Sequence, residues 1–175
     1  MAPTDNKRLI FKKHIKEAYN YINLINELFN KKINLEIIDI GTGAGFPGLS
    51  LAIYYEKNHF ILNDRKISRL KFIQKFAEKN GIDNAEYDTT EYNNLKYNNK
   101  YLTHFDIITF RAVDRLENII PEVLPLLKAD GYIICGKDSN YRNEFEKVSE
   151  LVSIFKEEKL QWGAILTLKK NNNFS

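Results

Sequence analysis

The chain has 175 residues, of which 43% are hydrophobic and 13% aromatic, enough for one compact domain with a substantial core. Its 26 basic and 23 acidic residues leave a formal charge of +3, which excludes a strongly cationic nucleic-acid coat. The single cysteine excludes an internal disulfide or a cysteine-rich metal site. Without an apolar run of membrane-spanning length or a signal-type segment, the chain is expected to be cytoplasmic, away from membranes and without a metal.

Hydrophobic spacing predicts helices and strands that alternate along the first half of the chain. Apolar side chains recur at helical intervals near the N-terminus, which predicts an amphipathic first helix. Pro47 suits the first turn of a helix, and Gly81 suits the end of one. The predicted elements are helix 5–30, strand 35–40, helix 47–55, strand 59–63 and helix 67–80. The segment 85–104 is ambiguous.

The second half continues the alternation. Its predicted elements are strand 105–110, helix 116–127, strand 131–136, helix 141–152 and strands 152–158 and 163–170. Alternating strands and helices with right-handed crossovers predict a mostly parallel sheet with helices on both faces, an α/β fold. We expect a helical segment over 1–30 packed on a domain over 31–170, with a disordered tail over 171–175.

A glycine-rich loop follows the first predicted strand, within "IIDIGTGAGFPGLSLAI" at residues 37–53. Glycines at 41, 43 and 45 permit positive φ and close approach of a ligand to the backbone. In open α/β sheets, ligands bind beyond the carboxyl ends of the strands, where this loop falls. The dinucleotide fingerprint requires a third glycine where Phe46 stands, which argues against a nicotinamide cofactor. A tight turn without a ligand is the alternative.

Asp64 comes directly after the second predicted strand, roughly 20 residues beyond the glycines. Its carboxylate is a candidate acceptor for both hydroxyls of a ribose, in charge-assisted hydrogen bonds. The alternative is a helix cap, because the next helix begins near Lys66. Both roles are compatible only if the two carboxylate oxygens face different ways.

Four segments together resemble the RsmG/GidB family of bacterial methyltransferases. They are "DIGTGAGFPGLSLAI", the Asp-x-Lys-x-x-Arg-x-x-Phe pattern over 64–72, "FDIITFRAVDRLENI" and "PLLKADGYIICGK". The resemblance implies a Rossmann-like class I S-adenosylmethionine-dependent methyltransferase fold with a seven-stranded, mostly parallel sheet. It further implies S-adenosyl-L-methionine as the cofactor and methylation of guanine N7 in 16S ribosomal RNA, naked or within the small ribosomal subunit. We expect a monomer.

The resemblance also suggests roles for individual residues. The candidate cofactor-binding residues are Asp39, Gly41, Gly43, Gly45, Phe46, Asp64 and Tyr92. Arg111 is the candidate catalytic residue acting on the substrate, through guanine O6 or a phosphate; its alternative role is a structural salt bridge to Asp106 or Asp114. The candidate RNA contacts are Lys13, His14, Lys66, Arg69, Arg111 and Lys137. A solvated basic face and a structural histidine are the alternatives for these contacts.

The chain also departs from the family pattern. Residues 91–93, "EYN", stand where the family carries Arg-Ala-Glu near the adenine, and Glu17 and Ala18 replace an aspartate-serine pair. An obvious acid-base pair is missing, which suits guanine N7, since its lone pair carries no proton to remove. The alternatives are a small-molecule methyltransferase, a nicotinamide oxidoreductase and a non-catalytic RNA-binding or assembly factor with the same fold.

Overall fold

The computed structural model describes residues 3–30 and 33–171, with side chains described from residue 15 onward in those ranges. Its helices are α1 (Pro3–Phe29), α2 (Gly48–Tyr54), α3 (Ile67–Lys79), α4 (Leu116–Val123) and α5 (Tyr141–Glu146), with short 3-10 helices η1 (Tyr92–Tyr97) and η2 (Leu124–Leu126). Its strands are β1 (Glu36–Ile40), β2 (His59–Asn63), β3 (Ala85–Asp88), β4 (Phe105–Arg111), β5 (Leu127–Asp138), β6 (Val152–Leu160) and β7 (Gly163–Lys170).

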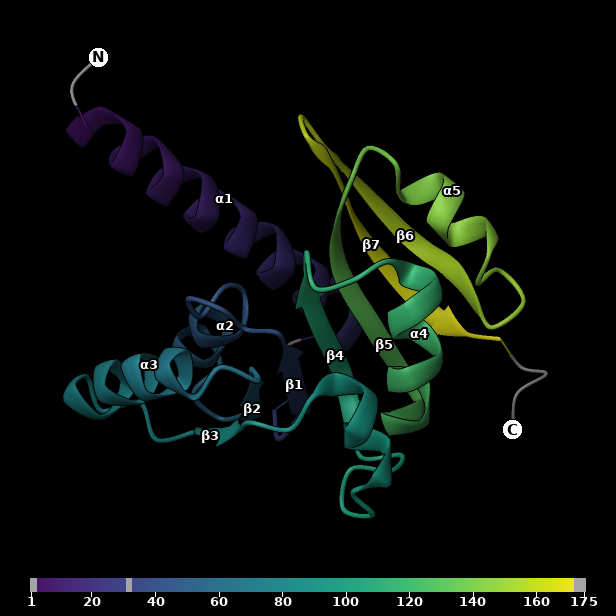
Figure 1. Cartoon of the computed structure of the whole chain (residues 1–175), viewed down its shortest axis with the longest axis horizontal. Helices are drawn as coiled ribbons and strands as arrows, with labels where there is room; N and C mark the ends of the chain where they lie inside the picture. The colour runs from purple at the N-terminus through teal and green to yellow at the C-terminus, as the bar shows by residue number, and fades with distance from the viewer. Residues whose placement is uncertain (1–2, 31–32, 172–175) are drawn as a thin grey trace.

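The strands form one seven-stranded sheet in the order β3-β2-β1-β4-β5-β7-β6. The first five strands in this order, β3, β2, β1, β4 and β5, pair in parallel with their neighbours. Strand β7 pairs antiparallel with both β5 and β6. Figure 1 shows this twisted sheet with helices on both sides. The predicted α/β fold and seven-stranded, mostly parallel sheet are confirmed.

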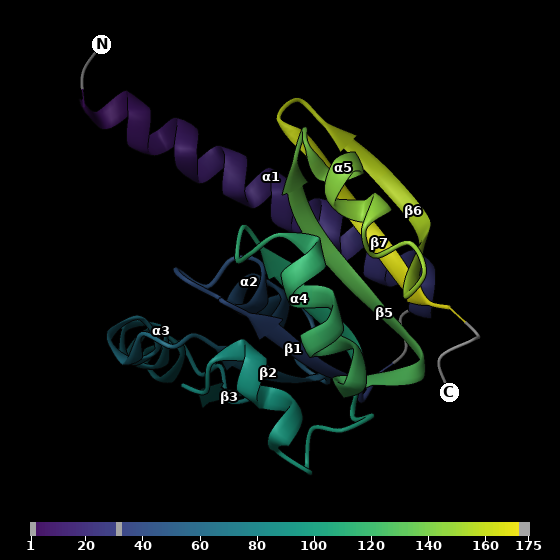
Figure 2. The ribbon, with the colours of Figure 1, turned by 45° about the vertical axis from the view of Figure 1, so that its right-hand side comes forward.

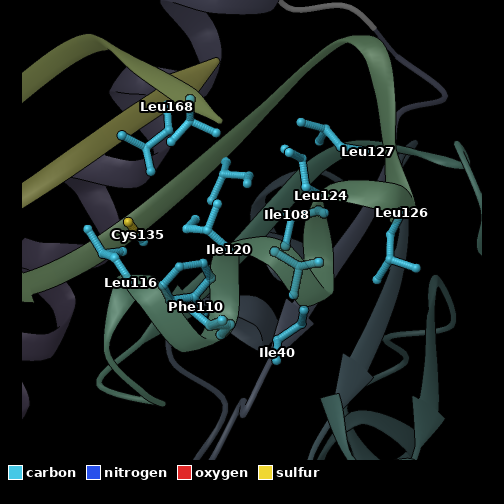
Figure 3. Close-up of a cluster of buried hydrophobic side chains, with 14 of the residues drawn as sticks. Ile40, Ile108, Phe110, Leu116, Ile120, Leu124, Leu126, Leu127, Cys135 and Leu168 are labelled. Atoms are coloured by element: carbon cyan, nitrogen blue, oxygen red, sulfur yellow. The ribbon is translucent and has the colours of Figure 1, made fainter. Parts of the chain in front are cut away.

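Two hydrophobic clusters cover the two faces of the sheet. One gathers side chains of α1, α2 and α3, and the other those of α4, η2 and α5. Alternation along each strand divides its residues between them, because successive side chains of a strand point to opposite faces. In β4, Ile107 joins the first cluster, whereas Ile108 and Phe110 join the second. Figure 3 shows Phe110 beside Leu116 in the second cluster.

The first helix differs in part from its prediction. Tyr21, Leu24 and Ile25 of α1 are buried against the sheet, so the C-terminal half of the helix belongs to the core. Ile15, expected on the buried stripe, is 39% exposed. Figures 1 and 2 show that α1 extends away from the sheet toward its N-terminal end, so its first turns lie beyond the surface that the stripe would cover.

Two other predicted helices are shorter in the structure. The helix expected over 116–127 ends at Val123, and η2 carries the chain to β5, which begins earlier than predicted, at Leu127. Pro125 has no backbone N–H for a continued α-helix. The helix expected over 141–152 ends at Glu146. The ambiguous segment 85–104 contains β3 and η1.

The cysteine is part of the core. Cys135 lies on β5 in the second cluster, where Figure 3 shows its sulfur among aliphatic side chains. Burial raises the pKa of its thiol to about 12, so the thiol stays protonated at neutral pH. Within the described ranges, none of the helices has the length and apolar character to cross a membrane.

Candidate active site

The glycine-rich loop connects β1 to α2. Gly41, Gly43 and Gly45 have φ values of +65°, +60° and +91°, as the sequence predicts for this loop. A Cβ added to Gly41 would lie 2.5 Å from Val113 Cγ2, so the loop also packs closely against the segment that follows β4. The loop is thereby fixed against the carboxyl end of β4.

Asp39 supports this loop from below. It lies opposite Thr109 in the parallel register of β1 and β4, and its Oδ1 accepts a hydrogen bond of 2.7 Å from Thr109 Oγ1. Its Oδ2 accepts the backbone N–H of Gly48 at 2.9 Å. A Cβ on Gly48 would collide with that oxygen, which explains a fourth glycine here. Asp39 is completely buried and therefore holds the loop from inside the protein.

Burial gives Asp39 an unusual titration. Desolvation raises the pKa of its carboxyl from the ordinary value near 4 to about 6, against the opposing effect of its hydrogen bonds. The native state therefore binds the proton more tightly than the unfolded state. The contribution of Asp39 to the free energy of unfolding accordingly falls as pH rises from about 4 to about 6.

We expect Thr109→Val to destabilise the protein more at pH 7.5 than at pH 5. At pH 7.5 Asp39 is ionised, and its lost hydrogen bond from Thr109 costs about 1.5–3 kcal/mol. At pH 5 the carboxyl is mostly protonated and the loss is smaller. Urea unfolding at both pH values measures the difference.

Thr167→Val is the matched control for this substitution. Thr167 is a buried strand threonine whose hydroxyl has no hydrogen-bond partner within the described ranges. Its replacement should therefore cost little at either pH. Equal losses for Thr109→Val at pH 5 and pH 7.5 would contradict the role assigned to the Asp39 carboxylate.

A cavity of about 480 Å³ opens at the carboxyl ends of β1 and β2. Its lining residues are Ile40, Gly41, Asn63, Asp64, Arg65, Lys66, Arg69, Thr90, Glu91, Tyr92, Asn93, Ala112, Val113 and Asp114. We call it the β2 cavity. Five predicted site residues, Gly41, Asp64, Lys66, Arg69 and Tyr92, come together here from three segments of the sequence.

Asp64 already has several partners in the β2 cavity. Its Oδ1 accepts the N–H of Lys66 at 2.9 Å, but Lys66 itself is the N-cap of α3 and this helix has no side-chain cap, so the capping alternative is wrong. Its Oδ2 accepts the N–H of Gly43 and a hydrogen bond from Arg69 Nη1, each at 3.0 Å. A carboxylate offers about four acceptor positions, so one stays open for a hydroxyl. A second hydroxyl would have to displace the Arg69 side chain, which is half exposed.

Tyr92 also lines the β2 cavity. Its hydroxyl donates to Asp114 Oδ2 at 2.7 Å and so ties η1 to the segment after β4. Burial and this hydrogen bond raise the pKa of Tyr92 to about 12, while hydrogen bonds from Asn118 and Tyr92 lower the pKa of Asp114. The donor is therefore protonated and the acceptor ionised at neutral pH.

A second cavity, of about 710 Å³, adjoins the first and is also lined by the glycine loop. Its lining residues are Gly41, Thr42, Gly43, Ala44, Phe46, Ser68, Arg69, Phe72, Arg111 and Ala112. We call it the β4 cavity. The two cavities share Gly41, Arg69 and Ala112, so they meet at these residues. Gly45 and Asp39, by contrast, line neither cavity.

Arg111 is the last residue of β4 and lines the β4 cavity. Its Nη1 donates to Glu17 Oε2 of α1 at 2.7 Å. The predicted alternative, a structural ion pair, is therefore present, but its partner is Glu17 rather than Asp106 or Asp114. Glu17 is only 5% exposed, whereas the Arg111 side chain is 26% exposed and reaches the cavity. Glu17 departs from the family pattern in sequence, but nothing local in the sequence indicates that it pairs with Arg111.

Lys137 lies in the protein interior, contrary to the expected surface contact. It lies on β5 two residues after Cys135, so alternation directs it to the face covered by α4 and α5, away from α1. Its Nζ lies 2.6 Å from Glu144 Oε2 and donates to the carbonyl of Asp114 at 2.9 Å. Both side chains of the ion pair are 7% exposed. RNA cannot reach this ammonium in the structure described.

Of the other predicted basic contacts, some line the cavities and some have side chains outside the described residues. Lys66 is exposed at the rim of the β2 cavity, and Arg69 lies between the two cavities. The side chains of Lys13 and His14 lie outside the described residues. The predicted RNA track therefore reduces, within the described side chains, to Lys66, Arg69 and Arg111.

Comparison with known families agrees with this geometry. The family described as "GidB: rRNA small subunit methyltransferase G" matches residues 1–172. The chain belongs to the GidB family.

Curated members of the GidB family align over most of the chain. The ribosomal RNA small subunit methyltransferase G of Syntrophomonas wolfei is 28% identical over 81% of the chain and 64% of its own length. That of Thermoanaerobacter sp. strain X514 is 33% identical over 73% of the chain and 54% of its own length. The chain thus spans between about half and two thirds of the length of these relatives.

Solved structures confirm the class I methyltransferase fold of this GidB family member. A proposed S-adenosyl-L-methionine-dependent methyltransferase from Methanococcus maripaludis superimposes with a TM-score of 0.72 at 15% identity, over 96% of the chain and 92% of that structure. The ribosomal protein L11 methylase of Lactobacillus delbrueckii gives 0.66 at 19% identity, over 79% and 71%. These likenesses concern the fold.

Proposed function

We propose that the chain transfers a methyl group from S-adenosyl-L-methionine to N7 of a guanine in 16S ribosomal RNA. The observation that carries the proposal is the pair of adjoining cavities at the carboxyl ends of β1, β2 and β4, in a chain of the GidB family. One cavity suits a nucleoside-bearing cofactor, and the other opens beside it for an acceptor. RNA, naked or in the small ribosomal subunit, is the proposed partner.

The residues of the β2 cavity fit the cofactor. Its volume of about 480 Å³ lies in the range of small-molecule sites. Asp64 has an acceptor position for a ribose hydroxyl, Tyr92 closes the wall beyond it, and Gly41 lets the backbone come close. Phe46 and Gly43 continue the surface into the β4 cavity. We assign Asp39 and Gly45 to supporting this surface from below.

The proposed reaction requires no general acid or base. When bound, S-adenosyl-L-methionine supplies a methyl group on a sulfonium, which the guanine N7 lone pair can take without loss of a proton. The chain's own residues then have to orient the acceptor and exclude water, effects that contribute about 7–11 kcal/mol in favourable cases. Arg111 is the proposed substrate contact. It must hold guanine O6 or a phosphate, because a hydrogen bond to N7 would occupy the attacking lone pair.

Transfer of labelled methyl to small ribosomal subunits that lack the modification tests the proposal. Digestion of the RNA should place the label in 7-methylguanosine. Transfer to another nucleoside, or to a small molecule but not to RNA, would contradict it in favour of another methyltransferase. Binding of subunits without any transfer would indicate the non-catalytic alternative.

We expect Asp64→Ala to weaken S-adenosyl-L-methionine binding by more than about tenfold, the loss of one charge-assisted hydrogen bond. Titration calorimetry measures the affinity, and circular dichroism checks the fold. Asp83→Ala, an exposed aspartate in the turn between α3 and β3, is the control and should bind normally. Unchanged affinity in Asp64→Ala would remove this residue from the cofactor site.

A further inference from the structure

The β4 cavity is lined by an exposed aromatic ring that has no role in the proposed methyl transfer as described above. Phe72 of α3 is 70% exposed and lines this cavity together with Arg69 and Arg111. The buried face of α3 carries Leu70, Ile73 and Ala77, so Phe72 contributes to the opposite, solvent-facing side. A large apolar side chain in this position adds little to the core.

Phe72 lines the β4 cavity close to the residues where this cavity meets the β2 cavity. Ser68 and Arg69 lie four and three residues before Phe72 on the same helical face, and all three line the β4 cavity. Arg69 also lines the β2 cavity, where it contacts Asp64. A planar group held against Phe72 would therefore lie in the compartment that adjoins the proposed cofactor site.

Guanine N7 can be methylated only where the enzyme can reach it. In an A-form RNA helix N7 faces a deep, narrow major groove that side chains do not enter. An acceptor guanine must therefore leave the helical stack or come from a single-stranded segment, and the lost stacking needs a replacement. Proteins commonly supply it with an exposed aromatic ring, with arginines nearby for the backbone.

We propose that Phe72 is the stacking platform for the acceptor guanine, which enters the β4 cavity as an unstacked base with Arg111 at its polar edge or phosphate. This inference rests on the proposed function and adds the residue that holds the base. Phe46 lines the same cavity from the glycine loop and gives it a second aromatic wall. The cavity volume of about 710 Å³ accommodates a purine nucleotide.

Methyl transfer to unmodified small subunits by Phe72→Leu and Phe72→Trp tests the platform. Leucine keeps an apolar side chain without a π-face, and tryptophan keeps a π-face with a different shape. We expect Phe72→Leu to lower kcat/KM for subunits by about tenfold or more and Phe72→Trp to stay within about threefold of the wild type. S-adenosyl-L-methionine affinity, by calorimetry, should stay unchanged in both.

Phe76→Leu is the matched control. Phe76 lies one turn further along α3 and is 45% exposed, but it lines neither cavity. It should transfer normally. Normal transfer by Phe72→Leu, or equal loss in the leucine and tryptophan variants, would overturn the stacking role while wild-type activity upholds the proposed function. Absence of 7-methylguanosine with the wild type itself would overturn both.

Discussion

Replacement of Arg111 by alanine is expected to lower methyl transfer by about 100-fold and to leave S-adenosyl-L-methionine affinity unchanged. The magnitude is that of losing one positioned donor in an active site. Arg111 lines the β4 cavity but not the β2 cavity, which is why the two readouts should separate. Labelled transfer to small subunits and calorimetry with the cofactor measure the two quantities.

The ion pair of Arg111 determines how this experiment must be designed. Alanine at this position would leave the Glu17 carboxylate, which is 5% exposed, without the guanidinium that binds it. Removing one partner from a buried ion pair destabilises a protein by itself. The informative comparison is therefore Glu17→Gln/Arg111→Ala against Glu17→Gln alone, because the difference isolates the guanidinium.

A control for the general loss of positive charge is also available. Arg115 follows β4 by four residues, and its side chain is 53% exposed and pairs with Glu117. Arg115→Ala should transfer within about threefold of the wild type, because an exposed ion pair contributes little. Normal transfer by the Glu17→Gln/Arg111→Ala variant would defeat the assignment of Arg111 to the substrate.

Lys137→Met is expected to lower the free energy of unfolding by about 3–5 kcal/mol. The substitution removes the ammonium 2.6 Å from Glu144 Oε2 and leaves that carboxylate buried. The same Glu144 oxygen accepts the backbone N–H of Leu116 at 2.9 Å, so the start of α4 depends on it as well. Urea unfolding at pH 7 measures the loss.

Lys147→Met is the control that distinguishes the effect of burying an ion pair from the effect of forming one. Lys147 forms an ion pair with Glu117 at 2.7 Å, nearly the same distance, but its side chain is 51% exposed. Its replacement should cost less than about 1 kcal/mol. If Lys137→Met cost no more than Lys147→Met, the buried ion pair would not have the structural role that we assign to it.

Much of the fold follows from local features of the sequence. Alternating apolar runs and helical stripes predict the order of the main elements, and the glycines at 41, 43 and 45 predict the positive φ values of the loop. The lengths of α4 and α5 were predicted less well. The prediction placed Pro125 inside the first of these helices, but α4 ends at Val123, and α5 ends at Glu146, six residues earlier than predicted.

The candidate site was predicted unevenly, for reasons that can be traced to single residues. Asp64 and Tyr92 follow neighbouring parallel strands, and the carboxyl ends of such strands meet at one edge of the sheet, so their shared cavity was predictable. Lys137 lies near the carboxyl end of β5, at the same edge, but strand alternation directs it to the face opposite α1. A position at the carboxyl end of a strand does not by itself indicate toward which face of the sheet the side chain points.

The sequence by itself determined the type of fold, the ligand-binding edge and the family, because periodicity, glycine spacing and local motifs are short-range properties. Only the tertiary structure decided which charges are paired and which are accessible. Glu17 meets Arg111 across 94 residues of chain, and Asp39 meets Thr109 across 70. Such pairs depend on the register of β1 and β4 and on the packing of α1, which arise only when distant segments come together.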